Sequence, residues 1–132
     1  MQFILNVGLG DIALAGIATG ALGGGGYAIF PLIVGDDRKD FIIQWGSLAP
    51  LTSGGSIEVK LPIAFPTTAM SAVAVHDNAS HWTRPTIYSV TTTSKTTLTA
   101  SATVLNAGVV GGNVTRGSDI TACYGRYIAI GC

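Results

Sequence analysis

Residues 56–63 read Ser56-Ile57-Glu58-Val59-Lys60-Leu61-Pro62-Ile63, and their large apolar side chains fall on every second position. A period of two places these side chains on one face of a β-strand. The preceding Ser53-Gly54-Gly55 predicts the turn that leads into it. This stretch is the clearest secondary-structure signal in the chain, and it predicts β-structure.

The rest of the chain from residue 40 onward carries the same signal. Two Thr-rich, β-branched runs, 86–93 and 96–104, meet at Ser94-Lys95 and are typical of a hairpin. Further strands are expected at 27–34, 41–45, 70–76 and 120–130. Long loops are expected at 77–85 and 106–119. About seven short strands with turns between them predict an all-β, antiparallel, sandwich-like domain.

One predicted strand is apolar on a single face. Phe41, Ile43 and Trp45 alternate with Ile42 and Gln44, so one face carries three large apolar groups. We therefore interpret Trp45 as a structural residue.

The first 39 residues differ in composition, because they are rich in Gly and Ala. The segment 12–22 fits either a short helix or an irregular, extended path, since Gly16 and Gly20 weaken a helix. We expect residues 1–39 to form a Gly-rich entry segment and residues 40–132 to form the β domain. The chain is interpreted as a C-terminal fragment of a longer protein, or as a naturally short one.

Composition excludes several classes of protein. The 132 residues have a mass of 13.5 kDa, enough for one domain, and their seven basic and seven acidic side chains cancel. A neutral chain offers no field that would attract nucleic acid. Only 11% of residues are charged, 48% are hydrophobic and the mean hydropathy is +0.50, which excludes disorder.

So little charge means that the chain lies in a membrane or buries its surface against copies of itself. Residues 12–34 carry no charge, but four consecutive glycines and Pro31 interrupt them, and no basic cluster flanks them. We therefore expect a chain that is not embedded in a membrane and that associates with itself.

No motif predicts catalysis or a cofactor. Gly8-x-Gly10-x-x-Ala13 resembles a dinucleotide fingerprint, but Asp11 would place negative charge where the pyrophosphate binds. His76 and His81 lie in a polar loop whose spacing matches no zinc site, although a metal role stays open. We expect no enzyme, no cofactor and no metal.

Two cysteines, Cys123 and Cys132, could form a bridge or stay reduced, and the absence of a signal peptide favours free thiols. Cys123 is expected to behave as a small buried hydrophobe.

Three segments together resemble the C-terminal domain of tail fibre proteins of tailed bacteriophages. These are Asp40-Phe41-Ile42-Ile43-Gln44-Trp45-Gly46, then Leu61-Pro62-Ile63-Ala64-Phe65-Pro66, and finally Tyr127-Ile128-Ala129-Ile130-Gly131-Cys132. The resemblance implies a homotrimeric β-rich tip at the distal end of a fibre in the virion, folded in the host cytoplasm. It implies binding to a host surface glycan, commonly lipopolysaccharide, or to an outer-membrane protein, with a fibre-assembly chaperone as a further partner.

The loops at 77–86 and 105–119 match the family least, so we expect them to set specificity. Aromatic faces stack on sugars while polar groups fix the hydroxyls. The candidate receptor-binding residues are Asp77, Asn78, His81, Trp82, Arg84, Asn113 and Arg116.

Several readings of these residues stay open. Trp82 could instead lie in the core or at a trimer contact. Arg84 and Arg116 suit anionic sugars or phosphates, or could pair with Asp77 or Asp119. The alternatives for the whole chain are a purely structural trimerisation module and a glycan-degrading enzyme.

Overall fold

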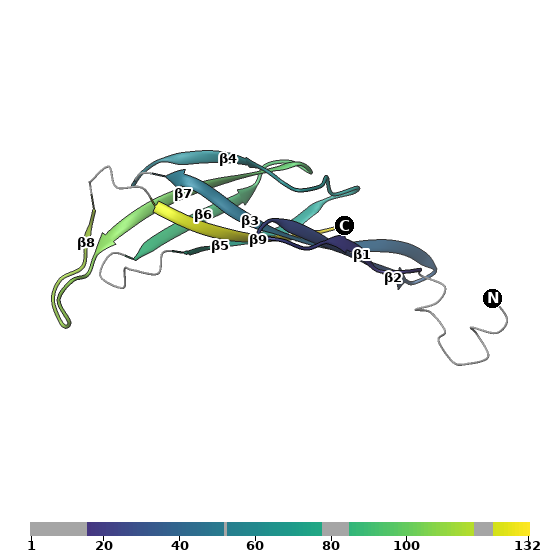
Figure 1. Cartoon of the computed structure of the whole chain (residues 1–132), viewed down its shortest axis with the longest axis horizontal. Helices are drawn as coiled ribbons and strands as arrows, with labels where there is room; N and C mark the ends of the chain where they lie inside the picture. Colours follow the sequence, from purple (N-terminus) through teal and green to yellow (C-terminus); the bar gives the residue numbers. More distant parts are fainter. Residues whose placement is uncertain (1–15, 52, 78–84, 118–122) are drawn as a thin grey trace.

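The computed structural model describes residues 16–51, 53–77, 85–117 and 123–132 (Figure 1). Every element in these ranges is a β-strand. The strands are β1 (Thr19–Ala21), β2 (Gly26–Val34), β3 (Asp37–Leu51), β4 (Ser56–Lys60), β5 (Ala69–His76), β6 (Thr86–Thr92), β7 (Thr97–Asn106), β8 (Thr115–Arg116) and β9 (Cys123–Gly131). The predicted all-β fold is confirmed.

The strands form two antiparallel sheets that pack against each other. Sheet A has the order β1-β2-β3-β9-β5, and sheet B has the order β4-β7-β6 with β8 pairing to the end of β7. The β6–β7 hairpin pairs Thr86 with Val104 and Thr92 with Leu98, as the Thr-rich runs predict. The alternating stretch at 56–63 forms β4, which ends at Lys60.

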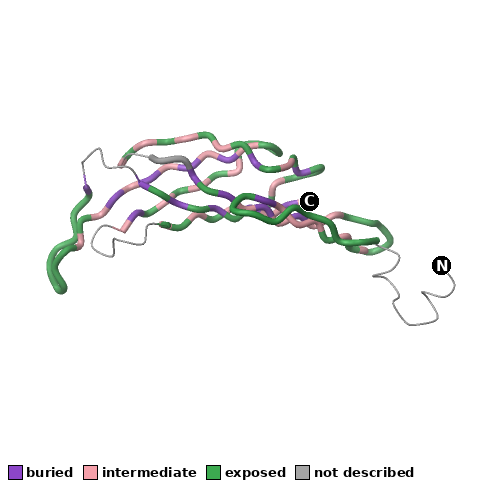
Figure 2. Tube along the Cα trace, viewed as in Figure 1, coloured by how far each residue is buried: buried purple, intermediate pink, exposed green. Residues whose placement is uncertain are grey.

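The core lies between the sheets, and β7 supplies its centre. Alternate residues of β7 are buried, and both neighbouring strands of sheet B cover its edges. Figure 2 shows this alternation along the strands. The buried apolar residues are Ile42, Leu48, Leu61, Phe65, Leu98, Ala100, Ala102, Val104, Cys123, Tyr127 and Ala129. Cys123 is therefore buried as expected, and no disulfide joins it to Cys132.

The face of β3 that enters the core is the one opposite Phe41, Ile43 and Trp45. Ile42, Gln44 and Leu48 are buried, whereas Phe41, Ile43 and Trp45 are half-buried on the other face. The fully buried Gln44 is satisfied on one side, because its Oε1 accepts a hydrogen bond from the Ile63 backbone N–H at 2.9 Å, whereas its buried Nε2 has no hydrogen-bond partner among the described residues. The three apolar groups that the alternation places on one face of β3 thus lie on the outer face of sheet A.

Three strand glycines of sheet A let aromatic rings fit between the sheets. Added Cβ atoms on these glycines would lie within 2.9 Å of ring atoms: Gly46 against Tyr127, Gly125 against Tyr88, and Gly131 against Phe65. Such distances are below van der Waals contact. The rings can therefore lie directly on the backbone of β3 and β9.

The N-terminal part is strand where the structure describes it. The segment 12–22 is expected to be either a short helix or an extended path; residues 12–15 lie outside the described residues, and Thr19–Ala21 form β1. Gly20 permits this pairing, because a Cβ there would lie 2.5 Å from the Tyr27 carbonyl oxygen. The helix is wrong, since cross-strand pairing to β2 satisfies the backbone instead.

Residues 26–51 form one long hairpin that crosses residue 40. β2 and β3 pair from Gly26–Trp45 to Val34–Asp37, with Gly35 in the turn at φ +65°. Residue 40 thus lies inside β3, and the domain boundary there stays a prediction.

The expected loop at 106–119 contains a short strand. β8 pairs with the end of β7 through Leu105–Arg116 and Asn106–Thr115. Its sequence carries no strand periodicity, because two residues are too few to show one.

We expect Gly125→Ala to destabilise the domain by about 1–3 kcal/mol, because the new methyl would overlap Tyr88 and the Val75 carbonyl oxygen. Gly108→Ala is the matched control, since no heavy atom lies within 4 Å of its added Cβ. Denaturant unfolding at equal protein concentration measures both. An equal loss of unfolding free energy in the two variants would contradict the proposed packing of Tyr88 on Gly125.

Burial raises the pKa of the Tyr88 phenol to about 12, with smaller contributions from Cys123 and Asp77. The phenolate is thus less favourable in the folded state than in the unfolded one, where the pKa is 10.0. The contribution of Tyr88 to the free energy of unfolding should be fully present below pH 10 and should be lost as pH rises from 10 towards 12. Spectrophotometric titration of phenolate absorbance should lose a late-titrating component in Tyr88→Phe; an unchanged titration would contradict this assignment.

Candidate functional site

The described ends of both predicted receptor loops lie at one end of the molecule. Strands β3, β5 and β7 finish there and β4, β6 and β9 start there, whereas the β2–β3 turn lies at the other end (Figure 1). Asp77 follows the last residue of β5, and Arg116 ends β8. The fold therefore brings the described ends of two loops that are far apart in sequence to the same end of the molecule.

Ser53 fixes the base of the second loop. Its Oγ donates a hydrogen bond to the Gly117 carbonyl at 2.8 Å and accepts one from the Val104 backbone N–H at 3.2 Å. The adjacent Gly54, at φ +81°, binds the Ala102 carbonyl through its N–H at 2.7 Å. A rigid turn thus supports the exposed Arg116, whose guanidinium lies above Gly54.

Asp77 and Arg126 fix the base of the first loop. Arg126 Nε donates to Asp77 Oδ2 at 2.8 Å, and the Asp77 N–H donates to the Tyr124 carbonyl at 3.0 Å. Both side chains are about half exposed, so the ion pair contributes little to stability. Its main effect is to set the position at which the chain leaves β5.

The same arginine also reaches the N-terminal part of the chain. Arg126 Nη1 donates to the Gly24 carbonyl at 3.0 Å, and Trp45 Nε1 donates to the Gly23 carbonyl at 2.9 Å. The glycine turn between β1 and β2 is therefore bound to β3 and β9. This explains the structural role predicted for Trp45.

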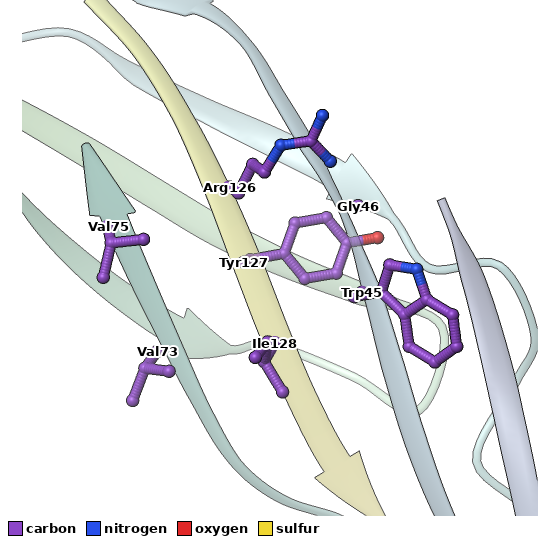
Figure 3. Close-up of a pocket in the computed structure, with 7 residues that line it drawn as sticks. All are labelled: Trp45, Gly46, Val73, Val75, Arg126, Tyr127 and Ile128. Carbon is purple, nitrogen blue, oxygen red and sulfur yellow. The ribbon is translucent and has the colours of Figure 1, made fainter. Parts of the chain in front are cut away.

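An apolar hollow lies on the outer face of sheet A. It has a volume of about 340 Å³. It is lined by Trp45, Gly46, Val73, Val75, Arg126, Tyr127 and Ile128. Figure 3 shows the valines of β5 and Ile128 of β9 beside the indole of β3. Register places Val73, Ile128 and Trp45 in one row across three strands.

The two outer faces of the sandwich differ in chemistry. Val73, Val75 and Ile128 are exposed by 57, 61 and 50% on sheet A. The outward positions of β4 and the central strand of sheet B carry mainly hydroxyl and charged groups: Ser56, Glu58, Lys60, Thr97, Thr99, Ser101 and Thr103. An exposed apolar face of this kind marks an interaction surface.

The described parts of the two loops contain only some of the predicted residues. Asp77, Asn113 and Arg116 are exposed at the loop end. Asn78, His81, Trp82 and Arg84 lie outside the described residues. His76 is half-buried at the end of β5.

Sequence reasoning missed Ser53 and Arg126, the two side chains that fix the loop bases. Ser53 had a signal in its Ser-Gly-Gly turn, whereas Arg126 looked like any outward residue of a strand.

Among the described residues, His, Cys, Asp and Glu side chains form no group of three that could hold a metal ion. Within those same ranges there is no helix long and apolar enough to cross a membrane.

Two solved structures of pyocin tail fibres have a fold similar to that of this chain. The chain is similar to the R2 pyocin fiber of P. aeruginosa, with a TM-score of 0.60 and 20% identity over 88% of this chain and 26% of that one. It is also similar to an N-truncated R1-type pyocin tail fiber, with a TM-score of 0.59 and 21% identity over 99% of this chain and 94% of that one. At these identities the likeness shows the fold alone.

A sequence relative is the uncharacterized protein StfP of Escherichia coli strain K12, which is 36% identical over 78 residues. The match covers 57% of this chain and 37% of StfP, so the chain spans only part of that relative's length. The sequence model of one family, described as "Putative tail fiber protein gp53-like, C-terminal", matches residues 38–132. Because that match covers most of the chain, the protein belongs to the gp53-like family of tail fibre C-terminal domains.

Proposed function

We propose that this chain is the receptor-binding tip of a phage-type tail fibre, located at the distal end of the fibre in the virion. The observation that carries the proposal is that the described ends of both predicted receptor loops lie at the end opposite the β2–β3 turn (Figure 1). Loops on a rigid β-scaffold are the usual place for binding residues. The family is one of tail fibre domains and not a known enzyme family, which supports binding over catalysis.

We further propose that the receptor is a surface glycan, commonly lipopolysaccharide. Arg116 and Asn113 are exposed, and a guanidinium and an amide suit the phosphates and hydroxyls of such a glycan. Trp82, His81, Asn78 and Arg84 supply the aromatic and polar groups of the first loop in this proposal. Asp77 would contribute mainly by its bond to Arg126, which sets the start of that loop.

The proposed assembly is a homotrimer that buries the outer face of sheet A. Its exposed apolar residues and the chain's low charge support association, since burying such a face is favourable. An assembly chaperone and folding in the host cytoplasm stay predictions of the family resemblance.

Light scattering of the purified chain should give a mass near three times 13.5 kDa. The apolar face of sheet A is the physical reason, because a monomer would leave it in water. A stable monomer at micromolar concentration would overturn the homotrimer.

We expect Arg116→Ala and Trp82→Ala each to weaken attachment to host cells by about tenfold or more, because each removes a contact of about 1–3 kcal/mol. Lys39→Ala is the matched control, since Lys39 is exposed on β3 beside the opposite turn. The measurement is binding of labelled trimer to host cells, with trimer mass checked in every variant. Unchanged binding in both loop variants would favour a purely structural trimerisation module.

The receptor class is tested on the same cells. Periodate oxidation of surface sugars should abolish binding, whereas protease treatment of the cells should leave it intact. The reverse pattern would assign the receptor to an outer-membrane protein. Release of reducing ends from purified host glycan would indicate the enzyme alternative.

A further inference from the structure

The β7–β8 connection projects from the body as an arm, residues 107–114 (Figure 1). Its apolar side chains are among the most exposed in the described residues, with Val110 at 92%, Val109 at 75% and Val114 at 58%. A tight turn holds the tip, since the Gly112 N–H binds the Val109 carbonyl at 3.0 Å and Gly111 adopts φ +77°. The arm is therefore an ordered apolar projection whose own chain does not cover its tip.

The apolar tip of the arm, Val109 and Val110, is unsuited to be the main contact for a sugar. No charged residue lies between Lys95 and Arg116, and valine side chains cannot hydrogen-bond the hydroxyls of a glycan. Water also solvates valine poorly, so full exposure of the tip is unfavourable. The chemistry of the tip fits an apolar pocket on a protein.

The chain itself offers such a pocket in the hollow of sheet A. Its rim is formed by Val73, Val75 and Ile128, each at least half exposed. The one cation in its lining, Arg126, is already bound to Asp77 and to the Gly24 carbonyl. Branched apolar side chains could enter without leaving a charge unsatisfied.

We propose that the arm of one copy packs into the sheet A hollow of the next copy around the trimer. This inference rests on the proposed homotrimer and assigns the contact that forms it. Each copy has one arm and one hollow, so the contact is heterologous and a three-fold rotation closes it into a ring. In Figure 1 the arm extends past the level of β5 and away from the body of its own chain.

The contact would also build the receptor end from two copies. The hollow includes Arg126, which holds Asp77 at the start of the first loop. An arm seated there carries its own Asn113 and Arg116 towards the neighbour's first loop. Each receptor end would then combine Asp77 of one copy with Asn113 and Arg116 of the next.

Cysteine pairs test the contact directly. In a Cys132→Ser background, Val110→Cys is combined in one chain with Val75→Cys or with Val73→Cys, and the protein is oxidised with oxidised glutathione. We expect at least one pair to form disulfides between copies, giving covalent dimers and trimers on a non-reducing gel. The matched control combines Val110→Cys with Ile87→Cys, because Ile87 is 58% exposed on sheet B.

Each outcome decides the proposal. Inter-copy bridges in a hollow pair but not in the control support it. Bridges that form only within one chain, or in neither hollow pair, overturn it.

A charge at the tip gives an independent readout. Val110→Asp should raise the concentration at which the trimer dissociates by about tenfold or more, because the carboxylate would be buried unpaired in an apolar hollow. Ile87→Asp should leave that concentration unchanged. A wild-type monomer would refute the homotrimer itself, whereas a wild-type trimer that survives Val110→Asp would refute only the arm contact.

Discussion

The two sheets can approach each other because three positions on the inner face of sheet A have no side chain. Tyr127, Tyr88 and Phe65 lie on Gly46, Gly125 and Gly131, and any Cβ at these glycines would overlap a ring. Two of the glycines lie in β9 and one in β3, the strands that form the middle of sheet A. The separation of the layers, and with it the core around Leu98 and Ala100, depends on these contacts.

This inner packing explains why the outer face of sheet A is apolar. Alanine, glycine and a buried glutamine occupy much of the inner face of β3, β5 and β9, while aromatic rings fill the space between the sheets. Larger aliphatic groups such as Val73, Val75 and Ile128 point outward. Much of the apolar area of sheet A therefore lies on its outer face, where a monomer would expose it to water. Such a face suits a subunit that is covered by a partner.

The strands and their turns could be predicted from local pattern, whereas the direction of their faces could not. Alternation identified β4 and the Thr-rich runs identified the β6–β7 hairpin, because both signals are local. The sequence did not show which face of β3 is buried, because a polar residue, Gln44, lies on that face. Its hydrogen bond to the Ile63 backbone joins distant parts of the chain and has no local sequence pattern. The ion pair at the start of the first loop could not be predicted either. Arg126 and Asp77 are far apart in sequence, and only the register of β9 with β5 brings them together.

The position of β9 has a consequence for how the domain forms. This strand lies between β3 and β5, yet it follows all of sheet B in the sequence. Until residues 123–131 have been synthesised, β3 and β5 each present an open edge with no neighbour on that side. The sheet therefore closes by insertion of a late strand between two early ones, a non-local step that makes folding slow and leaves the nascent chain open to wrong pairing.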